Sequence, residues 1–189
     1  MLSEYGLEYK LSIINQSPKK LPISFATHTT IAAPFVDGGA EENIRLKAPI
    51  TEKWVLNERC LPTGEVKALD EYDMGYANGT TCPVKRVVDN DMYSAEKQKY
   101  NGRPFRGIIM TDTESGKGIG YEVSEGYRFW IFWNDRGEKH YFCPEPMTAM
   151  IDAPNLDMPK EKTGYREIGS GEIYHIAQHF FTILPEDQA

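Results

Sequence analysis

Short stretches rich in β-branched and aromatic residues, separated by turns that contain glycine or proline, recur along most of this chain. The first is typical: apolar and polar residues alternate from Leu7 to Ile13, which is the period-two pattern of a strand with one buried face. Asn15-Gln16-Ser17-Pro18 then has the composition of a turn. Because such strands recur at near-regular spacing and helical periodicity is scarce, the sequence predicts an all-β antiparallel sandwich.

Three later stretches refine this prediction. Tyr127 to Trp133 is apolar on both faces apart from Arg128, as expected for a strand in the middle of a packed sandwich. Gly107 to Thr111 and Ile119 to Val123 flank a glycine-containing pentapeptide, which favours a hairpin. Glu172 to Leu184 is expected to form the last strand.

Helix is expected at one place at most. Ala95 to Tyr100 is the only modest helical candidate, whereas Asp70 to Thr80 is rich in Asp, Gly and Asn and is expected to be a loop. Leu61-Pro62-Thr63-Gly64-Glu65 has the chemistry of a turn. Arg45 to Val55 is expected to be extended, and so is Leu21 to Thr30.

Length and charge narrow the classes of function. The 189 residues suit one domain, so we expect residues 1–189 to form a single unit. With 21 basic and 28 acidic residues the net charge is −7, and no basic tract is present to neutralise a phosphate backbone, so nucleic acid is not an expected partner. No apolar stretch approaches the roughly 20 residues that cross a bilayer, and the N-terminus lacks a secretory pattern. We therefore expect no membrane association and a cytoplasmic location.

Metal and cofactor sites are not expected. Cys60, Cys82 and Cys143 are odd in number and far apart, which argues for reduced thiols without paired metal-ligand spacing. His175 and His179 are four residues apart, but their neighbours are strand formers. In a strand their imidazoles would be roughly 13 Å apart, too far to share one ion.

Glu145 lies between Pro144 and Pro146, and this placement is chemically suggestive. Pro146 disfavours helical backbone at Glu145, and Pro144 has a fixed φ, so the carboxylate is held on a stiff, extended segment. Such an acid could bind a ligand or accept a proton, but it could also be a surface Glu at a strand end. His28, expected on a strand face of small side chains, could converge with it across one cavity or could be a structural histidine.

Several stretches resemble the C-terminal portion of the galactose mutarotase, or aldose 1-epimerase, family and occur in the same order. The most specific, Phe142 to Asn155, looks like the signature around the family's catalytic glutamate. This chain is shorter than the usual family member, because family members usually carry a further N-terminal half with several strands. The family also usually has a proline and an aromatic where this chain has Thr29 and Thr30. The other similar stretches are Leu21 to His28, Leu61 to Glu65 with Tyr72-Asp73 after it, Asp89 to Tyr93, and Gly169 to Glu172.

The resemblance implies a galactose mutarotase-type sandwich that interconverts the α and β anomers of a hexose without cofactor or metal. By resemblance Glu145 is the base and His28 the acid. Asp73 and either Asp89 or Asp91 would bind sugar hydroxyls, and the sequence leaves open which of the last two does so. The two catalytic groups should face each other across a cleft with room for a pyranose ring.

Two alternatives follow from the short length. The chain could be a carbohydrate-binding or regulatory remnant that turns nothing over. It could also pair with a second copy or with a missing N-terminal half, because the first strand, Leu7 to Ile14, would otherwise leave an edge or an apolar face uncovered.

Overall fold

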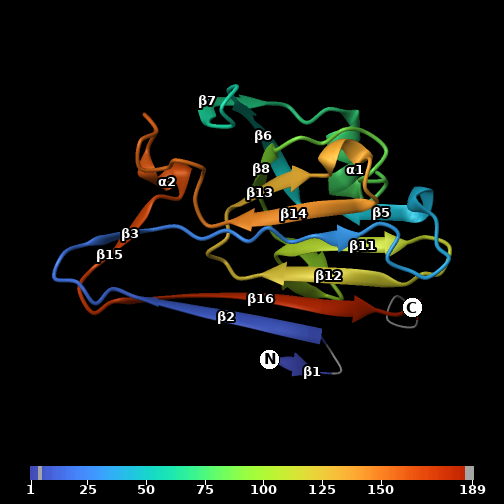
Figure 1. Ribbon diagram of the computed structural model, residues 1–189, viewed down its shortest axis with the longest axis horizontal. Coiled ribbons are helices and arrows are strands. Elements are labelled where there is room, and N and C mark those ends of the chain that lie inside the picture. The colour runs from blue at the N-terminus through green and yellow to red at the C-terminus, as the bar shows by residue number, and fades with distance from the viewer. Residues whose placement is uncertain (4–5, 186–189) are drawn as a thin grey trace.

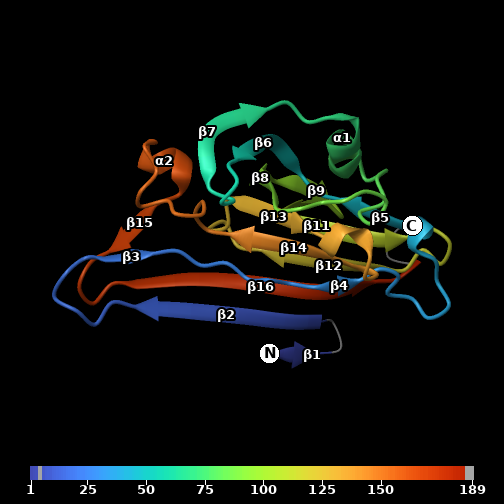
Figure 2. The same cartoon turned by 45° about the horizontal axis from the view of Figure 1, so that its top comes forward.

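Two six-stranded antiparallel sheets, packed face to face, form the body of the molecule. The computed structural model describes residues 1–3 and 6–185. In both views the long β2–β16 pair lies on one side, and α1, α2 and β7 lie on the opposite side (Figures 1 and 2). The predicted all-β sandwich is confirmed.

The first sheet has the order β1-β2-β16-β12-β11-β5. The expected strands near Leu7 and Glu172 are β2 and β16, which pair from Leu7↔Phe180 to Ile14↔Ile173. The predicted hairpin is β11–β12. The strands of this sheet are β1 (Leu2–Ser3), β2 (Gly6–Ile14), β5 (Ile44–Lys47), β11 (Gly107–Asp112), β12 (Gly118–Val123) and β16 (Ile173–Ile183).

The second sheet has the order β4-β14-β13-β8-β6-β7, so β13 is central as its apolar sequence predicted. Its strands are β4 (Ile31–Ala32), β6 (Ile50–Leu56), β7 (Pro62–Lys67), β8 (Asp91–Ala95), β13 (Phe129–Trp133) and β14 (Tyr141–Met147). Two small pairs complete the strands, namely β3 (Leu21–Ile23) with β15 (Arg166–Ile168) and β9 (Gln98–Tyr100) with β10 (Arg103–Phe105). The helical pieces are α1 (Glu71–Asn78), α2 (Lys160–Thr163) and short 3-10 turns at Glu41–Asn43 and Asp135–Gly137.

The main core fills the space between the two sheets. Trp130 and Phe132 of β13 are fully buried there, against Ile108 and Tyr121 of the other sheet. Because side chains alternate along a strand, Phe129 and Ile131 point away from this core. They form a second cluster with Ala149 and other residues of the segment after β14. The second sheet therefore has an inner face in the main core and an outer face that this segment covers in part.

The segment from Asp70 to Thr80 is not a loop but contains α1. Asp70 caps the helix, with its side chain accepting from the Asp73 backbone N–H at 2.7 Å, and Gly79 ends it in the left-handed region at φ 77°. The Asp and Gly that indicated a loop are the two caps of a short helix. In the described part of the chain, no helix has the length and apolar character needed to cross a bilayer.

Three further local predictions were wrong. Ala95 to Tyr100 is not helical, because it ends β8 and enters the β9–β10 pair. Leu61 to Glu65 enters β7, which pairs with β6 across a register shift, rather than forming a turn. Leu21 to Thr30 is not one strand: β3 ends at Ile23, where the chain leaves β15.

Candidate active site

Glu145 lies on the outer face of the second sheet. It is the fifth of the seven residues of β14 and pairs with Ile131, which belongs to the outer cluster. Its neighbour Pro144 pairs instead with Phe132 of the main core. The side chain of Glu145 is 18% exposed, so the carboxylate is partly withdrawn from water.

His28 reaches the same place from the segment between β3 and β4. This segment is outside the named strands and touches β14 through an isolated bridge between Ala26 and Met147. The expectation that His28 projects from a regular strand is therefore corrected. The segment from β3 to β4 pairs first with β15 and then with β14, instead of pairing with one strand along its whole length.

The residues on either side of His28 explain its direction. The Thr27 and Thr29 hydroxyls both hydrogen-bond the Tyr121 hydroxyl, at 3.0 and 3.1 Å. The Thr27 backbone N–H also donates to the carbonyl of Pro146 at 3.4 Å. With both threonines turned inward, the intervening His28 side chain points outward, where it is 59% exposed.

The imidazole and the carboxylate are in direct contact. His28 Nε2 lies 3.2 Å from Glu145 Oε1, and the His28 ring meets the edge of Trp133 with centroids 5.7 Å apart. Burial raises the pKa of the Glu145 carboxyl, and the neighbouring His28 charge opposes this rise. The two groups converge as expected, but at this distance no pyranose ring fits between them.

Close contact between His28 and Glu145 is still compatible with proton transfer at two oxygens that are bonded to one sugar carbon. The C1 hydroxyl oxygen and the ring oxygen of a hexose are bonded to the same carbon, so an acid and a base that serve them must lie near each other. A sugar bound over the exposed edge of His28 and Glu145 could meet both groups at once. An acid and a base on opposite sides of the whole ring are not required.

Asp91 does not share a face with Glu145. Glu145, Ile131 and Met92 form one row across β14, β13 and β8, so their side chains lie on one face and that of Asp91, next to Met92, lies on the other. There Asp91 accepts from Lys53 Nζ at 2.7 Å and from the Tyr93 hydroxyl at 3.3 Å.

Asp73 is enclosed in the same charged cluster. Its side chain is 1% exposed and accepts from Arg86 at 2.8 Å, from the Tyr93 hydroxyl at 2.7 Å and from Lys53 at 3.4 Å. These donors occupy the carboxylate and tie α1 to the second sheet. Sugar binding by Asp73 stays a prediction, but its geometry here is that of a structural carboxylate.

Asp89 is the exposed member of the three predicted sugar ligands. It directly follows Val88, whose carbonyl accepts from the backbone N–H of Asn134, and thus lies at the end of β13 that carries Trp133. Because Trp133 contacts His28, Asp89 flanks the same end of the sheet as the His28–Glu145 pair. Sugar binding by Asp89 or Asp91 stays a prediction, but Asp89 is exposed whereas Asp91 is paired with Lys53.

Sequence reasoning assigned no functional role to Cys143 and favoured a core role for Trp133. Cys143 is two residues from Glu145 on β14 and pairs with Trp133, so all three share the outer face. Period-two alternation through the Pro-Glu-Pro run would have predicted that Cys143 accompanies Glu145. Nothing in the sequence linked Tyr121 with Thr27, because their contact joins strands distant along the chain.

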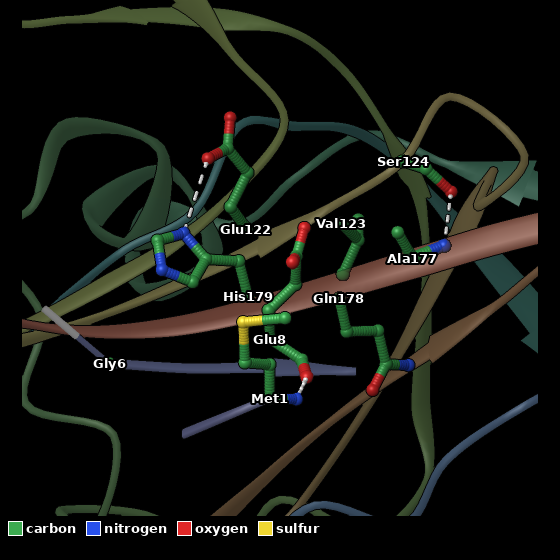
Figure 3. Close-up of a pocket in the computed structure, with 9 residues that line it drawn as sticks. All are labelled: Met1, Gly6, Glu8, Glu122, Val123, Ser124, Ala177, Gln178 and His179. Atoms are coloured by element: carbon green, nitrogen blue, oxygen red, sulfur yellow. Dashed lines mark hydrogen bonds and ion pairs between the residues drawn. The ribbon is translucent and has the colours of Figure 1, made fainter. Parts of the chain in front are cut away.

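A second His–Glu pair lies in a pocket on the first sheet (Figure 3). His179 and Glu122 are paired neighbours on β16 and β12, with His179 Nδ1 4.0 Å from the carboxylate. Arg103 already binds both oxygens of Glu122. This carboxylate is committed to a surface ion pair, which makes the pair a weaker candidate for proton transfer than His28 and Glu145.

Comparison with known proteins agrees with this architecture. The sequence model of the family "aldose 1-epimerase" matches residues 1–180. A galactose mutarotase-like protein from Clostridium acetobutylicum superimposes with a TM-score of 0.92 at 28% identity, over 97% of this chain and 54% of that one. A putative aldose 1-epimerase from Escherichia coli K12 gives 0.70 at 18% identity, over 95% and 57%. The chain thus spans little more than half the length of these structures, and by sequence and fold it belongs to the aldose 1-epimerase family.

Proposed function

We propose that this chain interconverts the α and β anomers of a hexose by acid–base ring opening, with Glu145 as base and His28 as acid. The observation that carries the proposal is the 3.2 Å contact between His28 Nε2 and Glu145 Oε1 on an accessible sheet face. Family membership supports the reaction class. The proposal includes three further points: the substrate is a hexose, Asp89 binds its hydroxyls, and the chain turns it over.

The proposed reaction moves two protons and breaks one bond. Glu145 takes the proton of the C1 hydroxyl while protonated His28 gives a proton to the ring oxygen. The C1–O5 bond then opens and C1 becomes an aldehyde. Rotation about C1–C2 presents the other face of the carbonyl, and the same transfers in reverse close the ring and restore both side chains.

The surroundings of each group suit its role. Partial burial raises the pKa of Glu145, which makes its carboxylate a stronger base than an exposed one. The His28 ring is largely exposed, so an incoming sugar can reach Nε2. Trp133, next to His28, offers an aromatic surface to the C–H groups of the ring.

The test is the polarimetric relaxation of freshly dissolved α-glucose and α-galactose. Glu145→Gln and His28→Gln should each slow catalysis by about 10²–10⁴-fold, the usual contribution of a positioned proton transfer. Glu138→Gln and His175→Gln place the same substitutions at exposed residues outside the site and should retain the activity. Undiminished catalysis in Glu145→Gln would remove this residue from the mechanism.

A second candidate is a carbohydrate-binding protein without turnover. It is favoured by one observation: the chain spans 54% of the similar Clostridium protein, so residues that a longer chain supplies could be needed for catalysis. Calorimetric binding of hexose with no acceleration of anomerisation would select this candidate. Acceleration that depends on Glu145 would exclude it.

A further inference from the structure

We propose that His28, Cys143 and Glu145 form a binding site for a divalent metal ion of the zinc class. The three side chains offer one nitrogen, one sulfur and one oxygen ligand atom, and these atoms all lie within 4.8 Å of one another. This site goes beyond the proposed reaction, which uses two of the three groups and no metal.

The backbone places the three ligands without rearrangement. Cys143 and Glu145 are two residues apart on β14 and therefore project from the same face, while His28 is held against β14 by its neighbours' contacts with Tyr121 and Pro146. The rigid part of the site is thus the strand β14, which has neighbours on both sides in the sheet, and the adjustable part is an imidazole with a largely exposed ring.

The distances suit tetrahedral coordination. Ligand atoms at the usual zinc bond lengths of about 2.0–2.3 Å are about 3.3–3.8 Å from one another in a tetrahedron. His28 and Glu145 are 3.2 Å apart already, and the widest separation in the group, at most 4.8 Å, needs a contraction of no more than about 1 Å. A small rotation of the His28 and Glu145 side chains can supply it.

The second sphere and the charge also suit such an ion. The Thr30 hydroxyl lies 3.3 Å from Cys143 Sγ and can donate to a metal-bound thiolate, as outer-sphere partners commonly do. A thiolate and a carboxylate together neutralise a 2+ ion. Of the three side chains, that of His28 is the most exposed, at 59%.

The mixed ligand set selects the class of metal. Magnesium and calcium prefer sites made of oxygen ligands only. A thiolate with an imidazole and a carboxylate instead suits zinc, and cobalt(II) can replace zinc as a coloured probe.

Occupancy would block proton transfer, because the ion would hold the nitrogen and the oxygen that serve the sugar. This inhibitory consequence rests on the proposed function, whereas metal binding does not. The two ideas can therefore fail separately.

The experiment is a titration of the whole metal-free chain with Co²⁺ in the absence of sugar. We expect one equivalent to produce the near-ultraviolet thiolate-to-cobalt charge-transfer band, and Zn²⁺ to abolish it. Cys143→Ser and His28→Gln should each weaken Co²⁺ binding by at least about 10–100-fold, the loss found when even an outer-sphere partner is removed. Cys60→Ser, at an exposed thiol, should keep the band.

Three results would overturn the site: no band at saturating Co²⁺, a band that persists in both ligand variants, or a band lost in Cys60→Ser. Because Cys143 is fully buried and its variant could misfold, His28→Gln at an exposed side chain decides in that case. A chain that binds Co²⁺ but does not anomerise hexose when metal-free would instead overturn the proposed function alone.

Discussion

Asp91 and Glu145 project from opposite faces of the same sheet, although they are separated only by β13. The row Met92–Ile131–Glu145 fixes this relationship, because adjacent residues of a strand point to opposite sides. Asp91, one of the two alternative sugar ligands that the sequence left open, is thereby paired with Lys53 on the inner side.

We therefore predict different effects for Asp89 and Asp91, which are two residues apart. Asp91→Asn should lower the free energy of unfolding by about 1–3 kcal/mol, because it weakens a charge-assisted contact with Lys53, and should leave kcat/KM nearly unchanged. Asp89→Asn should leave stability unchanged and raise KM. Urea unfolding and polarimetry on both variants test this, and the reverse pattern would make Asp91 the sugar ligand.

Asp73 is expected to be important for stability. Its carboxylate is buried among Arg86, Tyr93 and Lys53, so Asp73→Ala should cost about 3–5 kcal/mol by leaving buried partners uncompensated. Asp70→Asn is the matched control: it loses a more exposed ion pair with Arg86 but keeps a side-chain oxygen for the helix cap, and should cost less than about 1 kcal/mol. Equal losses in the two variants would contradict this assignment.

Strands with a clear repeat were predictable from sequence. The apolar run of β13 reflects burial on both faces. The alternation of β2 correctly predicted a strand, but its apolar face is not buried: Leu7 and Tyr9 are 45% and 43% exposed, and Leu11 and Ile13 are half-buried. The Pro-Glu-Pro run likewise gave the rigid strand that carries Glu145.

The missed features depend on partners elsewhere in the chain. Asp and Gly are common both in loops and at helix caps, so Asp70 and Gly79 are compatible with either structure. Only packing decides between a loop and the helix α1. His28 is directed by Thr27 and Thr29, which bond Tyr121 more than 90 residues away. Such a contact leaves no local pattern in the sequence.

The pH dependence of catalysis should follow the raised pKa of Glu145. The base works as a carboxylate, so activity should rise with pH through this pKa, and the midpoint should lie above the ordinary value of 4.5. His28→Gln should move the pKa of Glu145 further up, because the opposing positive charge is lost. Carbon-13 NMR titration of the Glu145 carboxyl measures both values without requiring turnover, and a fall of the pKa in His28→Gln would contradict the coupling.

The same pKa also predicts a stability effect. A carboxyl whose pKa is higher in the folded than in the unfolded chain holds its proton longer when folded, so its contribution to stability falls as pH rises through that range. Glu145→Gln should therefore be at least as stable as the wild type at neutral pH. Thermal unfolding at pH 4 and pH 7 checks the sign, with Glu138→Gln as the exposed control.

Tyr121 is predicted to position His28 without touching the sugar. Its hydroxyl bonds both threonines that flank His28, and its ring stacks on Phe180 with centroids 4.0 Å apart. Tyr121→Phe keeps the stacking and removes the two hydrogen bonds, so stability should fall by about 1–2 kcal/mol. Catalysis should fall in kcat, with little change in KM, because the acid is less well oriented.

Tyr127→Phe provides the matched comparison for this variant. The Tyr127 hydroxyl accepts from Gln178, which in turn donates to Thr27, so this variant removes one buried hydrogen bond of the same network but leaves both threonine contacts of Tyr121 in place. If orientation of His28 is what Tyr121 contributes, kcat falls clearly more in Tyr121→Phe than in Tyr127→Phe at similar loss of stability. Equal effects on kcat would show that the network acts through general stability of the core, and His28 would then need no support from the threonines beside it.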